Sequence, residues 1–269
     1  MVSPSASLTM WASAWLAGNC APDDVLDAMQ EWAPMHLVGA ADPVIAHRTG
    51  LPWPDARDAE TMSALKTVRE AAGHDGSALR LVLPVPGDVR GLPPAGPFTA
   101  AAITTGEGLL VGNPGTEGVG LVPVRSGPDV LCWTIFGVDI PPRAEELGLG
   151  EAEFAMRTAM RDAADAMAAV QRVGTTEFDP RAALEEQFAE NARHKLPDAV
   201  PTRALRILES ADRVDAILAV AQRGSTATAL TAAGADNIDG LLRPLYAAVR
   251  SARLAAIESC VRTATRELG

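Results

Sequence analysis

The sequence predicts an α+β fold, with N-terminal helices on a small, mostly antiparallel sheet, followed by a helical, bundle-like C-terminal region. Two observations predict it. Residues 91–138 carry only four charges (Glu107, Glu117, Arg125 and Asp129) and are dense in Gly and Pro, which is typical of short strands joined by turns. Residues 139–269 have apolar residues at helical spacing almost throughout. We expect residues 1–142 to form a platform domain and 143–269 the helical region, either as two domains or as one continuous domain.

The N-terminal part is expected to alternate between helices and connections. Apolar residues recur at helical spacing over 8–16, Gly18 suits the C-cap of this helix, and a second helix begins at Pro22. Residues 35–38 are a strand candidate. The stretch 42–57 contains three prolines and Gly50 and is predicted to be a loop, and residues 58–72 are predicted to be helical.

The predicted sheet begins with the alternating leucines of residues 79–83. A proline-rich arch follows over 84–97, because proline lacks an N–H and fixes φ. Three more strands are expected near 107–112, 118–124 and 130–137. Their short connections indicate hairpins and therefore antiparallel neighbours. Residues 98–105 fit either a strand or a short helix.

Four helices are predicted after residue 142, near 149–170, 180–194, 202–222 and 240–267. In the last of them, Pro244 is expected in the first turn, where proline is tolerated. Residues 224–238 are predicted to be a connection that holds at most one short helix. A methionine stripe on the first of these helices (Met156, Met160 and Met167) fits core packing, or a binding face that adapts to different partners.

Composition limits the classes of function. The net charge of −11 argues against general nucleic-acid binding, which needs a positive surface, although five arginines lie within 241–266. Three distant cysteines without CxxC spacing indicate a reducing cytoplasm rather than a disulfide framework. The chain shows no basic signal region and no long apolar run, so we expect neither export nor a membrane span. Arginine greatly outnumbers lysine, which suggests a bacterial genome of high GC content.

Motifs of high specificity are absent from the sequence. We find no phosphate-binding loop, no HExxH, no cysteine–histidine cluster and no nucleophile elbow, and therefore expect no cofactor and no metal. The weak catalytic candidates are His36, Asp42 and His47, because two imidazoles and a carboxylate could act as acid and base near neutral pH. Their spacing follows neither helical nor strand periodicity, so such an enzyme would depend on the loop at 42–57.

Two stiff loops offer candidates for ligand binding. Trp53 lies between Pro52 and Pro54, and Asp88 and Arg90 lie in the arch 84–97. Rigid loops on a sheet commonly carry recognition residues, so the three side chains would contact a small molecule if both loops bordered one pocket. The alternative is a structural Asp–Arg pair and a tryptophan that covers the edge of the core.

The leading functional hypothesis is a non-catalytic, cytoplasmic protein that works through protein–protein contacts, with a protein partner or by self-association. It follows from the missing catalytic constellation and from a charge-poor platform and methionine-rich helix, both suited to burial against a partner. A small-molecule binding or sensory protein and an enzyme built on His36, Asp42 and His47 are the alternatives.

Overall fold

The structure, a computed structural model, describes residues 3–55, 61–73, 76–143, 147–169, 185–186, 188–189, 193–228 and 232–266. Its contacts form two compact units. The platform unit comprises Ser3–Glu145, His194–Pro201 and Ile257–Gly269. The helical unit comprises Met1–Val2, Glu146–Arg193 and Thr202–Ala256. The chain therefore enters the platform unit three times.

The prediction of an α+β fold is confirmed. The platform unit contains a five-stranded sheet in the order β1-β5-β4-β3-β2, and three of its four strand pairings are antiparallel. Both predicted hairpins are present, and β1 joins the sheet parallel to β5. The strands are β1 (Met35–Ala40), β2 (Leu79–Val82), β3 (Gly108–Val111), β4 (Glu117–Arg125) and β5 (Val130–Asp139).

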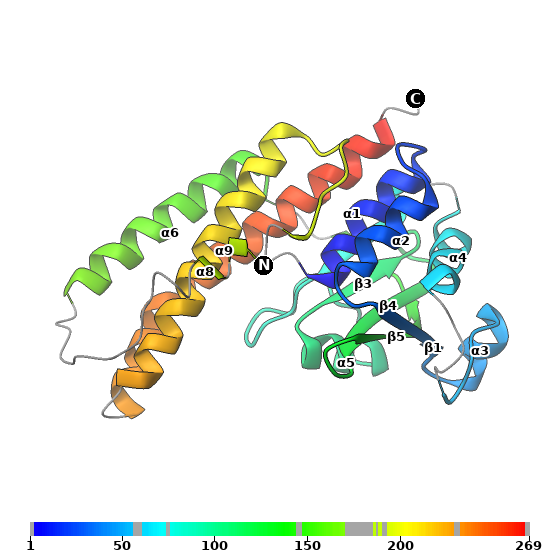
Figure 1. The fold of residues 1–269 in the computed structure, drawn as a ribbon, viewed down its shortest axis with the longest axis horizontal. Helices are drawn as coiled ribbons and strands as arrows, with labels where there is room; N and C mark the ends of the chain where they lie inside the picture. Colours follow the sequence, from blue (N-terminus) through cyan, green and yellow to red (C-terminus); the bar gives the residue numbers. More distant parts are fainter. Residues whose placement is uncertain are drawn as a thin grey trace. The chain divides into compact units, whose positions relative to one another are not determined.

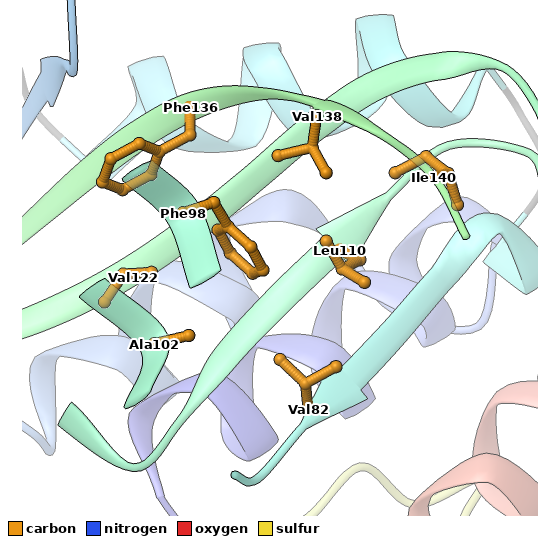
Figure 2. Packing of buried hydrophobic residues seen from close by; sticks show 8 residues of the cluster. All are labelled: Val82, Phe98, Ala102, Leu110, Val122, Phe136, Val138 and Ile140. Atoms are coloured by element: carbon orange, nitrogen blue, oxygen red, sulfur yellow. The ribbon is translucent and has the colours of Figure 1, made fainter. Parts of the chain in front are cut away.

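Helices lie on both faces of this sheet (Figure 1). On one face, α1 (Pro4–Leu16) packs on β2, β3 and β4. Helix α4 (Thr61–Ala72) packs on β1, β3 and β4 of the same face, and α2 (Pro22–Gln30) packs on α1 and α4. On the other face lies α5 (Pro97–Thr105), so the ambiguous segment 98–105 is a helix. Figure 2 shows the core beneath α5, where Phe98 and Ala102 pack with Val122 and Phe136.

The close approach of α5 to the sheet depends on Gly120. A Cβ atom at this position would lie 2.3 Å from the Phe98 ring. We expect Gly120→Ala to destabilise the protein by about 1–3 kcal/mol, the usual cost of overpacking a core. Phe98→Leu in the same chain should recover part of this loss, which thermal unfolding of both single variants and the double variant would measure. Strictly additive losses would contradict a direct clash between the two positions.

Helix α1 is buried on nearly all sides although it is rich in hydroxyl groups. The hydroxyl of Thr9 donates to Ser5 O and that of Ser13 donates to Met10 O, so both side chains are satisfied within the helix. At the N-terminus of α1, a carboxylate oxygen of Glu107 accepts a hydrogen bond from Ser5 N at 2.7 Å. Burial raises the pKa of Glu107, and hydrogen bonds from Ser3 and Ser5 oppose this shift. Glu107 thus places its carboxyl group at the positive end of the helix dipole, where a negative charge is favoured.

The prediction of a continuous loop over 42–57 is wrong. Residues Pro43–Thr49 form α3, whose N-terminus is capped by the Asp42 side chain and whose C-cap is Gly50 with φ of 71°. The proline and the glycine that suggested a loop are the start and stop signals of a short helix. Helix α3 covers the end of β1 and β5, where Ile45 fills the space beside Gly137.

The helical unit contains longer helices than predicted. These are α6 (Leu149–Ala169), α8 (Thr202–Thr228) and α9 (Ala232–Arg266), whose last part belongs to the platform unit. The predicted connection 224–238 is largely helical, and most of the predicted helix 180–194 lies outside the described residues. Pro244 lies inside α9 and not in its first turn. Proline's ring crowds the carbonyl four residues earlier, which here belongs to Gly240.

The platform unit includes the C-terminal end of α9. Ile257, Cys260 and Val261 are buried there, and the buried carboxylate of Glu258 accepts a hydrogen bond from Arg143. Arg143 also donates to Ser77 O. The segment that leaves β5 is therefore bonded both to α9 and to the residues before β2.

Candidate functional site

The face of the sheet beneath α5 is only partly covered. Side chains alternate along a strand, so Val124 lies on the same face as Gly120 and Val122, which pack beneath Phe98. Val124 pairs with Cys132 and Cys132 pairs with Leu37, so these three residues form a row across β4, β5 and β1. A second row pairs Val130 with Met35. We call Met35, Leu37, Val124, Val130 and Cys132 the uncovered sheet surface.

The uncovered sheet surface is apolar and without charge. Met35 is 53% exposed and Val124 is 47% exposed, although both are large hydrophobic residues. Leu37, Val130 and Cys132 are half-buried. Contiguous exposed apolar residues are a common feature of surfaces that contact another molecule.

Trp53 lies at the same edge of the sheet. It follows Pro52, whose carbonyl accepts a hydrogen bond from Ala40 N at the end of β1, and it is 49% exposed. Asp88 and Arg90 form an ion pair, in which Arg90 Nη2 lies 2.7 Å from Asp88 Oδ2 and Arg90 Nε lies 2.9 Å from Asp88 Oδ1. This is the structural pair that the sequence offered as an alternative to a ligand contact.

The structure does not bring the two candidate loops together. The loop with Trp53 follows β1 and the arch with Asp88 follows β2, and β1 and β2 are the opposite edges of the sheet. Four strand spacings separate these edges, which is about 19 Å. The two strands also run in opposite directions, so the chain leaves them toward opposite ends. The backbone of Gly91 lies against Val82, which keeps the arch beside β2.

The candidate His36 is a buried residue with both ring nitrogens engaged. Its Nε2 lies 2.9 Å from Met29 O, and its Nδ1 accepts a hydrogen bond from Trp133 Nε1 at 3.0 Å. This pattern places the proton on Nε2. Burial lowers the pKa of His36, and the positive charge of Arg125 also lowers it. The neutral ring thus joins α2 to the sheet.

His36, Asp42 and His47 do not form a shared site. His36 is the second residue of β1, whereas α3, with Asp42 as its N-cap and His47 in its last turn, follows the other end of the strand. The four strand residues after His36 alone span about 13 Å. Asp42 accepts hydrogen bonds from two α3 amides, and His47 is exposed. Within the described part of the chain, no three His, Cys, Asp or Glu side chains are grouped so that they could hold a metal ion.

Sequence reasoning missed a polar cluster in the helical unit. Arg253 of α9 places its Nη2 2.6 Å from Asp212 Oδ1 and 3.1 Å from Asp215 Oδ2, both on α8. Burial raises the pKa of Asp212 to about 7, helped by the charge of Asp215, and burial raises the pKa of Asp215 to about 6. Burial also lowers the pKa of Arg253 to about 10. The available signal was the spacing of two aspartates on one helix face, but nothing in the sequence pairs them with Arg253.

The predicted methionine stripe is only partly buried. Within the methionine stripe, Met156 is buried and Met160 is partly exposed, and the side chain of Met167 lies outside the described residues. Of the helices in the described ranges, none has both the length and the apolar character needed to span a bilayer.

Comparison with known proteins places the chain in a family. Residues 5–147 match the model of the Rv1486c-like protein N-terminal domain, and residues 150–254 match that of the Rv1486c-like protein C-terminal domain. The chain belongs to the Rv1486c-like family. Members of this family include the uncharacterized protein Rv1486c of Mycobacterium tuberculosis H37Rv, which is 43% identical over 97% of this chain and 98% of its own length.

A second Rv1486c-like relative, the uncharacterized protein ML1804 of Mycobacterium leprae, is 40% identical over 97% of this chain and 98% of its own length. These relatives are bacterial, as the arginine-rich composition suggested. No solved structure matches the chain. The two family segments meet between residues 147 and 150, whereas the last part of α9 belongs to the platform unit in space.

Proposed function

We propose that this protein works through protein–protein contacts made by the uncovered sheet surface and catalyses no reaction of its own. The observation that carries the proposal is a continuous, uncharged group of five apolar residues, two of them about half exposed, beside a part of the same face that α5 covers. The cores of protein interfaces are depleted of charge in the same way. We place the protein in the cytoplasm, where its three free cysteines stay reduced.

The geometry gives less support to the two alternatives. A small-molecule pocket built from Trp53, Asp88 and Arg90 needs both loops at one place, but they lie at opposite edges of the sheet. An enzyme that uses His36 needs a ring nitrogen free for proton transfer, and both nitrogens of His36 are hydrogen-bonded inside the fold.

Purification from the native host tests the proposal. Native mass spectrometry of the wild-type chain is expected to show one defined polypeptide bound to it, and Val124→Lys should remove that polypeptide because a buried unpaired charge is costly. Val44→Lys is the matched control, since Val44 is 73% exposed on α3 and outside the uncovered sheet surface. Both variants should unfold at the temperature of the wild type. A polypeptide retained by Val124→Lys, or a bound metabolite in its place, would overturn the proposal.

A further inference from the structure

We infer that the uncovered sheet surface receives an amphipathic helix with a basic polar side, supplied by another protein. This inference rests on the proposed function and names the kind of partner. Three properties of the platform unit carry it: the closed edge of β1, the dimensions of the surface and the charge around it.

The edge of β1 argues against an extended peptide as the occupant. Met35 N donates to Asp129 O and Ala41 N donates to Ile135 O, so the odd-numbered residues of β1 bond toward β5. The even-numbered residues between them therefore direct their backbone N–H and C=O groups to the outer edge of the sheet. Val38, at the middle of that edge, has no exposed surface. Ala40 N already donates to Pro52 O. A peptide strand therefore cannot extend the sheet here, and the occupant has to lie on the face of the sheet.

The dimensions of the surface fit one helix. Three adjacent strands and two rows of side chains cover about 14 Å by about 13 Å, using the usual spacings of a sheet. A helix with its side chains is about 10–12 Å across. A standard protein–protein interface buries about 800 Å² on each partner, several times the area of this surface, which favours a single helix over a whole folded domain as the occupant. Helix α5 already covers the neighbouring part of the same face with Phe98 and Ala102.

The net negative charge of the platform unit favours a different protein over a second copy of this chain as the occupant of the uncovered sheet surface. Residues 1–142 contain 15 Asp and Glu against 7 Lys and Arg, a net charge of 7 − 15 = −8. Asp129 is exposed directly beside Val130, and the guanidinium of Arg125, which is exposed beside Val124, donates to Pro128 O and Trp32 O. A second platform unit would bring like charge to this rim, whereas a helix with lysine or arginine along its polar side would be attracted.

A designed peptide tests this inference on the full-length chain. The probe is a helical peptide of about 18 residues, roughly five turns, made only of leucine and lysine at helical spacing. Its controls are a leucine–lysine peptide of period two, which favours a strand, and a leucine–glutamate helix. Binding is measured by fluorescence anisotropy to the wild type, to the double variant Met35→Ser/Val124→Ser and to Val44→Ser. Serine adds no charge, so a loss of binding reports apolar contact.

Cys132 gives a second measurement, because it lies within the surface. Burial raises the pKa of Cys260 to about 12, and burial together with Asp24 raises the pKa of Cys20 to about 11. Both thiols are therefore poor nucleophiles at neutral pH. Alkylation of Cys132 by N-ethylmaleimide should slow when the helical leucine–lysine peptide is present and stay unchanged when the leucine–glutamate helix is present instead.

We expect the double variant to bind the helical leucine–lysine peptide about tenfold more weakly than the wild type, equivalent to about 1.4 kcal/mol, with Val44→Ser unchanged. Equal binding of the period-two peptide or of the leucine–glutamate helix, or unprotected Cys132, would overturn the helix inference. A wild-type dimer in sedimentation that the double variant loses would replace the helix by a second copy and keep the proposed function. If neither peptide binding nor association responds to the double variant, both proposals fail.

Discussion

Arg253→Met is expected to destabilise the helical unit by about 3 kcal/mol at pH 8, the loss typical of a buried ion pair that loses one partner. Arg253 is 12% exposed, and its Nη2 bridges Asp212 and Asp215 on successive turns of α8. Without the guanidinium, the two carboxylates repel each other, and burial strengthens this repulsion. They must then either bind protons or become exposed to water.

The sign of the pH dependence follows from the raised pKa values. The pKa of Asp212 is about 7 and that of Asp215 about 6, both above the value of 3.8 of an ordinary aspartate. The folded state therefore binds protons more tightly than the unfolded chain, and the stability that this binding contributes is full below pH 3.8 and lost as the pH rises through 6 and 7. At pH 5 both carboxyl groups can take up protons in the variant, so the loss should shrink to about 1 kcal/mol, that of a hydrogen bond.

Urea unfolding of the wild type and Arg253→Met at pH 5 and pH 8 measures this difference, and hydrogen exchange assigns it to α8 and α9. Arg203→Met is the matched control, because Arg203 pairs with Glu153 in an exposed pair on the same unit and such pairs contribute about 0–1 kcal/mol. Asp212→Asn combined with Arg253→Met should recover stability at pH 8. A loss that is equal at both pH values would show that the carboxylates do not cause it.

A chain that ends at Ala256 is expected to lose the cooperative unfolding of the platform unit. The truncation leaves both family segments intact, since the second ends at residue 254. It removes Ile257, Cys260 and Val261, which are buried, and the carboxylate of Glu258 that holds Arg143. Each large buried aliphatic side chain contributes about 1.5–3 kcal/mol, so the combined loss is a large part of the 5–15 kcal/mol that stabilises a domain.

Thermal unfolding followed by tryptophan fluorescence checks this prediction, because Trp11, Trp32 and Trp133 all belong to the platform unit. Val261→Ala provides the graded control and should lower stability by about 1–2 kcal/mol while cooperative unfolding persists. A chain ending at Ala256 that unfolds like the wild type would show that the end of α9 adds nothing to the platform unit.

Periodic segments of the sequence were predicted well. The alternating leucines gave β2, and Asn113-Pro114-Gly115 and Ser126-Gly127-Pro128 gave the two hairpins, because turn residues act locally. Short helices and the pairing of strands that are distant in the sequence were predicted less well. The seven-residue α3 lacks enough periodicity to be recognised, and the parallel pairing of β1 with β5 joins strands far apart in the sequence.

The candidate sites also show the difference between local features and contacts made by residues distant in the sequence. The side-chain types of His36 and Trp53 suggested chemistry, but their surroundings depend on neighbours that only folding supplies. His36 meets Met29 and Trp133 in the core, whereas the pair of Asp88 and Arg90 is local and was among the alternatives that the sequence offered. The uncovered sheet surface could not be identified from the sequence, because its five residues look like any other strand positions until α5 covers one part of the face and leaves the rest.

Local sequence was enough to predict the α+β class, the hairpins and the helical character of the C-terminal region, since these depend on propensity and periodicity over a few neighbouring residues. Tertiary structure alone decided that the end of α9 completes the platform unit, that Arg253 lies between two aspartates, and that Met35 and Val124 stay exposed beside buried neighbours. Each of these joins residues distant in the chain, and the free energy of burial that selects such contacts is a property of the whole packed core rather than of any segment.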